Sequence, residues 1–219
     1  GRRFGYAAEV AREPLAARFY DENFVIPPNA HAVERNRWLA SAAFGHPLDL
    51  PLDYGIAAQS IDFDWIGDAP YSLFFTASSR DEKLWSEDHW ETLARKLLEG
   101  DSGMERITPI FPSGTTRERE RAERIARRVE GARIAPPLTL RELAGLIKGA
   151  RISVGVDTGL VHLAAALRVP AIALYTASDP ALTGLYGTGF HRNLGARGRA
   201  PSADDVLAVT RQSLLENPA

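Results

Sequence analysis

The chain has 219 residues, which is enough for one complete α/β domain and part of a second. Charged residues make up 25% of the chain and the formal net charge is -2, so the overall charge gives no support for nucleic-acid binding. The absence of cysteine excludes disulfides and thiolate metal sites, and the lack of a long apolar run or a signal peptide favours an intracellular soluble protein.

The first 60 residues are expected to be helical and irregular, without a central strand. One helix is expected over 7–20, and a second from a cap at Asn29 to about Phe44. A short strand is expected around 54–57, inside a linker rich in proline, aspartate and glycine. Because the chain begins without a methionine and this segment cannot bury its apolar faces alone, we interpret the sequence as a piece of something longer.

From residue 71 onwards, strand patterns and helix patterns alternate. Strands are expected over 71–76, 107–111, 133–135, 152–156 and 170–176, and helices after caps at Ser86, Thr115, Thr139, Asp157 or Thr158, and Ser202. A loop rich in glycine and aspartate is expected between the last strand and the last helix. The alternation predicts an α/β fold with a parallel, doubly wound sheet and helices on both of its faces.

Polar side chains follow three of the predicted strands, and the carboxyl ends of parallel strands form the usual ligand-binding edge. In the first loop, the hydroxyls of Ser78 and Ser79 and the ammonium of Lys83 could hold phosphate oxygens. The alternative is that Lys83 is a solvated surface residue paired with its neighbour Asp81.

The second and third loops also admit two interpretations each. Glu118 could accept hydrogen bonds from ribose hydroxyls, or it could simply complete a capping box with Thr115. Asp157, Thr158 and Gly159 open a helix whose free N–H groups favour an anion, and His162 lies one turn further along. Alternatively, Asp157 is only a cap and His162 a partly buried histidine bonded to a carbonyl.

Several common site patterns are missing from the sequence. It contains no Gly-x-Gly-x-x-Gly fingerprint, no Walker A sequence and no Gly-x-Ser-x-Gly elbow, and its five histidines show no metal-ligand spacing. The common dinucleotide-binding, P-loop and serine-hydrolase interpretations therefore lose support, and no metal is expected.

The motifs themselves resemble those of a known family. The stretch 78–90, the block 156–167 with its Asp-Thr-Gly-Leu-Val-His sequence, and the segment 174–187 with its Asp-Pro pair are similar to bacterial ADP-heptose:lipopolysaccharide heptosyltransferases of glycosyltransferase family 9. Upstream, 11–16 and 31–35 also resemble that family. The resemblance implies the carboxyl-terminal half of a GT-B fold, with 1–60 a helical remnant of the acceptor domain plus linker and 61–219 the Rossmann-like donor domain.

The resemblance also implies roles for individual residues. Lys83 and Asp157 would be catalytic, with Lys83 neutralising the ADP diphosphate as it departs, without a metal or another cofactor. Glu118 would hold the adenosine ribose and Leu138 would pack near the adenine. The remaining donor contacts would come from Ser78, Ser79, Asp157, Thr158, Gly159 and His162.

The implied activity is inverting transfer of L-glycero-D-manno-heptose from ADP-heptose to the Kdo residue of Kdo2-lipid A, in the cytoplasm and peripherally on the inner membrane. The family's general base, an aspartate in an amino-terminal Lys-x-Ser-Ser-x-Gly-Asp-like motif, has no counterpart here, so the chain alone is expected to be inactive. The alternatives are a type II or III transferase acting later in the core, and a non-catalytic nucleotide-sugar-binding module.

Six arginines crowd the amino-terminal segment, where two interpretations remain open: Arg2, Arg3, Arg12, Arg18, Arg35 and Arg37. They could face anionic lipid or an acidic acceptor sugar, or they could be ordinary solvated side chains. Peripheral membrane contact is thus expected from the family resemblance rather than from these residues.

Overall fold

The computed structural model describes residues 1–100 and 104–217, and its internal contacts divide the chain into two compact units. The smaller unit comprises 1–52 together with 181–184, and the larger one comprises 53–180 and the chain from Leu185 onwards. We describe each unit by itself.

The larger unit is built on a parallel six-stranded sheet in the order β5-β4-β3-β6-β7-β8. The strands are β3 (Tyr71–Phe75), β4 (Thr108–Phe111), β5 (Arg133–Ile134), β6 (Ile152–Val156), β7 (Ala171–Tyr175) and β8 (His191–Gly195). The chain starts in the middle at β3, proceeds outwards to β5, returns to β6 and proceeds outwards again to β8. This is a doubly wound α/β sheet, so the predicted fold class is confirmed.

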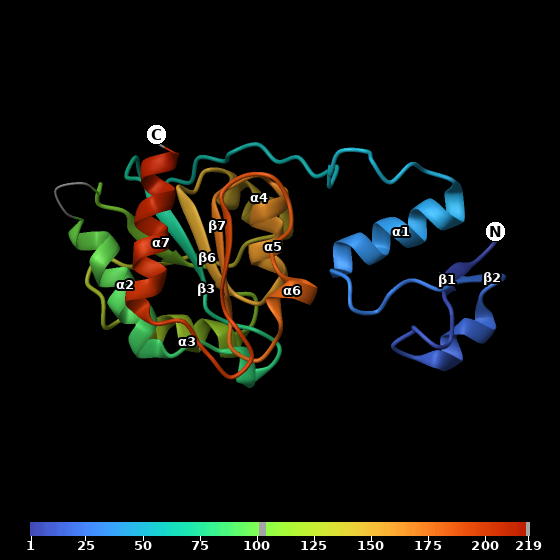
Figure 1. Cartoon of the computed structure of the whole chain (residues 1–219). Helices are drawn as coiled ribbons and strands as arrows, with labels where there is room; N and C mark the ends of the chain where they lie inside the picture. The colour runs from blue at the N-terminus through green and yellow to red at the C-terminus, as the bar shows by residue number, and fades with distance from the viewer. Residues whose placement is uncertain (101–103, 218–219) are drawn as a thin grey trace. The chain divides into compact units, whose positions relative to one another are not determined.

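Helices cover both faces of this sheet, as Figure 1 shows for α2 and α7 on one side and α4 and α5 on the other. These helices are α2 (Glu87–Glu99), α3 (Thr116–Ala126), α4 (Leu140–Lys148), α5 (Gly159–Ala166) and α7 (Ala203–Glu216), whereas most of the short α6 (Pro180–Thr183) belongs to the smaller unit. Buried side chains of α2, α3 and α7 pack on the face that carries Phe74, and those of α4 and α5 on the face that carries Phe75.

The predicted caps explain where the helices begin. Ser86, Thr115, Thr139 and Ser202 each accept a hydrogen bond from a backbone N–H of the first turn, and the last three form complete capping boxes. Such a cap stabilises a helix by about 1 kcal/mol. Before α2, the rings of Trp85 and Trp90 meet edge to face at 4.9 Å, which fixes the direction in which the chain enters the helix.

The segment after β7 corrects the sequence interpretation, because it contains α6 and the edge strand β8 rather than only a loop. Polar residues such as Arg192 and Asn193 hide this strand from a pattern that seeks apolar runs. They are tolerated because an edge strand is only half covered. Gly195 ends the strand at φ +85° against the carbonyl of Tyr175, where any side chain would collide.

The smaller unit differs more from the prediction. It contains two three-residue strands, β1 (Phe4–Tyr6) and β2 (Glu22–Phe24), paired in parallel, and strands this short give no detectable periodicity. The helix predicted over 7–20 is wrong, because only the 3-10 helix η1 (Pro14–Phe19) forms there. In the larger unit, the strand predicted around 54–57 is also wrong, since those residues form neither strand nor helix.

Helix α1 (Ala32–Phe44) forms in the smaller unit, but its cap is not Asn29. Instead, Nδ1 of His31 accepts from the N–H of Val33. The helix ends at Gly45, which adopts the left-handed conformation at φ +70° as the sequence predicts for a stop signal. The amino-terminal arginines are mostly engaged: Arg2 pairs with Glu22, Arg3 with Asp21, Arg35 stacks on Tyr6, and Arg37 donates to backbone carbonyls.

Candidate functional site

The strand order of the larger unit creates a switch point between β3 and β6. Because β3 and β6 are neighbours whose chains leave in opposite directions, the loops after them diverge at the switch point of the sheet. Ligands of doubly wound sheets bind in the crevice at such a point. The loop after β3 carries Lys83, within the 3-10 helix η2 (Asp81–Lys83), and β6 leads directly into Asp157.

These two residues form an ion pair at the switch point. Nζ of Lys83 lies 2.6 Å from Oδ2 of Asp157, and the side chains are only 14% and 10% exposed. The hydroxyl of Ser178, from the loop after β7, donates to the same Oδ2 at 2.6 Å. The alternative interpretation, in which Lys83 is a solvated residue paired with Asp81, is therefore wrong, because Lys83 is largely buried and Asp81 holds Arg117 at 2.7 Å instead.

The Asp157 carboxylate is kept ionised by its neighbours. Burial raises its pKa, but the polar hydrogens of His162, Lys83 and Ser178 together outweigh that cost and hold the pKa well below its usual range. Nε2 of His162 lies 3.8 Å from Oδ1, which is beyond hydrogen-bond length, so Lys83 and Ser178 make the direct contacts.

A cavity of about 660 Å³ opens beside this ion pair. Its walls come from the three loops that the sequence indicated, and the lining residues are Ser78, Ser79, Lys83, Thr115, Arg117, Glu118, Asp157, Thr158, Gly159 and His162. The structure therefore brings eight of the nine predicted site residues to one cavity. Leu138 is the ninth, and it packs against the apolar layer under α4 and α5 instead of lining this cavity.

The amino end of α5 points its first turn at the cavity. Its N-cap residue Thr158 makes no side-chain cap hydrogen bond, in contrast to α2, α3, α4 and α7. Asp157 is not the cap either, since its carboxylate is held by Lys83 and Ser178. A Cβ added at Gly159 would meet no atom within 4 Å, so this position leaves room for a ligand to approach the backbone.

Glu118 caps helix α3, which is the simpler of its two predicted roles. Its Oε2 accepts from the N–H groups of Gly114 at 2.7 Å and Thr115 at 3.1 Å, which completes the capping box of α3. The residue nevertheless lines the cavity, and a carboxylate oxygen can accept from a ligand hydroxyl while it caps a helix.

Sequence reasoning missed Ser178, Thr115 and Arg117 as parts of this site. Thr115 and Arg117 line the cavity beside Glu118, and Ser178 holds the Asp157 carboxylate. The signal for Ser178 was available, because it lies three residues after β7, at the same edge of the sheet as the other loops. It stayed hidden because the segment was interpreted only as a loop.

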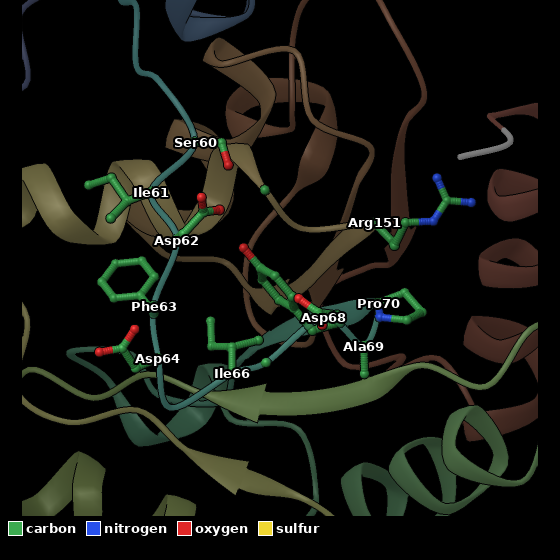
Figure 2. A pocket seen from close by; sticks show the side chains of 13 residues that line it. Ser60, Ile61, Asp62, Phe63, Asp64, Ile66, Asp68, Ala69, Pro70 and Arg151 are labelled. Atoms are coloured by element: carbon green, nitrogen blue, oxygen red, sulfur yellow. The ribbon is translucent and has the colours of Figure 1, made fainter.

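A second cavity, of about 480 Å³, lies at the opposite, amino-terminal edge of the sheet (Figure 2). The segment 60–70 forms most of its wall, and Tyr71, Gly149 and Arg151 complete it. Burial raises the pKa of Tyr71 to about 12, and its hydroxyl donates to the carbonyl of Leu146. None of the predicted site residues lines this cavity.

The sequence of the chain matches one known protein family over most of its length. The model of glycosyltransferase family 9 (heptosyltransferase) matches residues 1–207. The chain belongs to this family. The resemblance inferred from the motifs is thereby confirmed, and it includes the Asp157–His162 block that forms one wall of the cavity.

Individual family 9 members agree with this assignment. Lipopolysaccharide heptosyltransferase 1 of Pseudomonas aeruginosa is 39% identical over 187 residues, which are 84% of this chain and 50% of the relative. The structure of E. coli heptosyltransferase WaaC with ADP matches with a TM-score of 0.78 at 33% identity, covering 96% of this chain and 65% of that one.

A second WaaC structure, with ADP-2-deoxy-2-fluoro heptose, matches with a TM-score of 0.74 at 33% identity, covering 100% of this chain and 66% of that one. These neighbours are heptosyltransferases of GT-B architecture. The chain spans between 50% and 58% of the length of the curated relatives it matches.

Within residues 1–100 and 104–217, no group of three or more histidine, cysteine, aspartate or glutamate side chains is arranged to hold a metal ion. In the same part of the chain, every helix is too short or too polar to cross a membrane.

Proposed function

We propose that this chain binds ADP-heptose and forms the donor-binding part of an inverting heptosyltransferase that adds the first heptose to the Kdo residue of Kdo2-lipid A. In this proposal, residues 61–219 form the donor domain, and residues 1–60 belong to the acceptor domain and the linker. The acceptor is a lipid, so we further propose that the protein acts in the cytoplasm, peripherally at the inner membrane.

One observation carries the proposal: the only lysine that lines the 660 Å³ cavity lies at the switch point of the sheet, opposite the uncapped amino end of α5. A diphosphate carries the negative charge that both the Lys83 ammonium and a helix amino end favour. Ser78, Ser79 and Thr158 add hydroxyl donors on the same walls. The cavity therefore suits a nucleotide diphosphate attached to a polyhydroxylated group.

The proposed chemistry follows from this arrangement. A hydroxyl of the acceptor sugar attacks the anomeric carbon of heptose and gives its proton to a general base, which the family resemblance assigns to an amino-terminal motif with no counterpart in these 219 residues. The bond from the anomeric carbon to the phosphate oxygen breaks, and ADP leaves with the bonding electrons. Inversion results because attack and departure occur on opposite sides. Lys83 stabilises the charge that develops on the leaving diphosphate, which makes the reaction independent of a metal ion.

The other residues are assigned to parts of the donor. Glu118 would accept hydrogen bonds from the ribose hydroxyls, and Asp157 and His162 would contact heptose hydroxyls. Leu138 would pack near the adenine after a movement of the segment that precedes α4. The relatives named lipopolysaccharide heptosyltransferase 1, and the WaaC structures with ADP and with a fluorinated ADP-heptose, support the choice of donor.

Calorimetric titration of the chain with ADP and with ADP-heptose, without metal, tests the proposal. We expect saturable binding of both, which Lys83→Ala weakens roughly 10- to 100-fold because a charged hydrogen bond is lost. The matched control is Lys96→Ala, whose ammonium pairs with Glu99 on the exposed face of α2 and should bind as the unchanged chain does. A folded chain that binds neither nucleotide, or equal affinities for both lysine variants, would refute the donor site.

A further inference from the structure

The Lys83 ammonium has two potential partners in the proposed reaction. In the structure it is bound to Oδ2 of Asp157, with both side chains largely buried. The proposed function needs the same ammonium on the diphosphate. If the diphosphate draws the ammonium away from Oδ2, the Asp157 carboxylate loses its nearest cation inside a largely buried site.

Ser178 is placed to stabilise the Asp157 carboxylate when Lys83 moves away. Its hydroxyl donates to Asp157 Oδ2 at 2.6 Å, and the residue does not itself line the cavity, so it leaves the donor space free. Among the described residues, Lys83 and Ser178 are the two whose side chains donate a direct hydrogen bond to this carboxylate. Leaving a buried carboxylate without any such donor carries a large desolvation cost.

The segment that carries Ser178 is itself anchored. It follows β7 directly, and two residues earlier the hydroxyl of Thr176 donates at 2.7 Å to the carbonyl of Glu82, the neighbour of Lys83. The carbonyl of Thr176 also accepts at 2.7 Å from the N–H of Gly198. The segment thus contacts both sides of the Lys83–Asp157 pair.

We propose that Ser178 is a positioning residue that holds the Asp157 carboxylate in place while Lys83 exchanges Asp157 for the donor diphosphate. This inference rests on the proposed function. It assigns Ser178 no contact with the donor; the residue acts through Asp157 alone. Removing its hydroxyl should therefore cost more in the donor-bound state, where Asp157 has lost Lys83, than in the free state.

Titration of the chain with ADP measures this difference. Ser178→Ala should weaken ADP binding about tenfold, and Ser178→Thr, which keeps the hydroxyl, should restore most of the affinity. The matched control is Ser153→Ala, which removes a hydroxyl from β6 that finds no hydrogen-bond partner in residues 1–100 and 104–217. That variant should bind ADP as the unchanged chain does, and thermal unfolding should show that all variants are folded.

A double-mutant cycle separates positioning from a general structural role. Because Ser178 is proposed to act only through the Asp157 charge, Ser178→Ala should change ADP affinity less than about twofold when Asp157→Asn is already present. An equal loss in both backgrounds would overturn the inference.

Lysine-selective ¹³C labelling follows the exchange itself, since the chain has only three lysines: Lys83, Lys96 and Lys148. Saturating ADP should move the Lys83 Cε resonance, assigned with Lys83→Arg, and leave the other two in place. An unmoved Lys83 resonance at saturation would overturn the exchange. If the unchanged chain does not bind ADP, the proposed function falls and this inference falls with it. If it binds and Ser178→Ala binds equally well, only the inference falls.

Discussion

The Lys83–Asp157 pair makes a prediction about stability that needs no ligand. Replacing Lys83 with methionine keeps much of the side-chain volume but leaves the Asp157 carboxylate, which is 10% exposed, without its cation. Breaking a buried pair in this way costs about 3–5 kcal/mol of unfolding free energy, and we expect the lower end because Ser178 still donates to Oδ2. The expected loss for Lys83→Met at pH 7 is therefore about 3 kcal/mol.

The pH dependence of this loss has a definite sign. In the unchanged chain the pKa of Asp157 is depressed below its ordinary value of 3.8, so its stabilising contribution is fully present above that value. The contribution is lost only as the pH falls further, through the depressed folded-state pKa. In Lys83→Met, Asp157 stays buried but has lost its cation, so its pKa rises. Protonation of Asp157 in the folded variant then removes the unpaired buried charge and with it the loss of stability. The difference in unfolding free energy should be largest at pH 7 and should shrink as the pH falls towards 4.

Denaturant unfolding of both chains at pH 7 and near pH 4 measures the two differences. The control is Lys96→Met, which removes an exposed pair and should cost less than about 1 kcal/mol at either pH. A loss for Lys83→Met that is equal at the two pH values would refute the argument, since it would trace the effect to packing rather than to the Asp157 charge.

The remaining predictions concern packing in the larger unit. Gly145→Ala places a Cβ against the side chain of Ile61 and should cost about 1–3 kcal/mol in denaturant unfolding, whereas Gly159→Ala meets no atom and should leave stability unchanged. The same Gly159→Ala variant should weaken ADP binding in calorimetry, because its Cβ enters the space proposed for the donor; unaltered binding would contradict that placement. Arg121→Met removes a largely buried guanidinium that donates to the Trp85 carbonyl, and should lower unfolding free energy by about 2 kcal/mol; a loss below about 0.5 kcal/mol would show that the bond is replaced by water.

The central part of the fold was predictable because local signals and the fold agree there. The capping boxes at Thr115 and Thr139, the paired tryptophans at the start of α2 and the apolar run of β6 each determine one boundary through contacts within a few residues. Elements without such local signals were missed. The edge strand β8 is polar, and β1 and β2 become strands only because they pair with each other across the intervening chain.

The candidate site was also predictable only in part. The rule that ligands bind at the carboxyl ends of parallel strands was enough to gather Lys83, Glu118 and Asp157 in one cavity. It could not predict which groups pair across that cavity, because the partner of Lys83 depends on the strand order. Only the adjacency of β3 and β6 brings Lys83 to Asp157 rather than to the nearby Asp81.

The adjacency of these strands also explains why the two charges can serve the proposed reaction. The two charges stand on separate loops, one in η2 and one directly after β6, so the long Lys83 side chain can turn away from Asp157 while the backbone of both segments stays in place. The aspartate positions the lysine ammonium, but a diphosphate carries more negative charge than one carboxylate and so competes for that ammonium. In the proposed exchange, the hydroxyl of Ser178 would lower the cost to Asp157, because the carboxylate would keep the hydrogen-bond donor that it has in the structure. Under these proposals, the sheet's switch point would both hold the donor and let Lys83 move between two anionic partners.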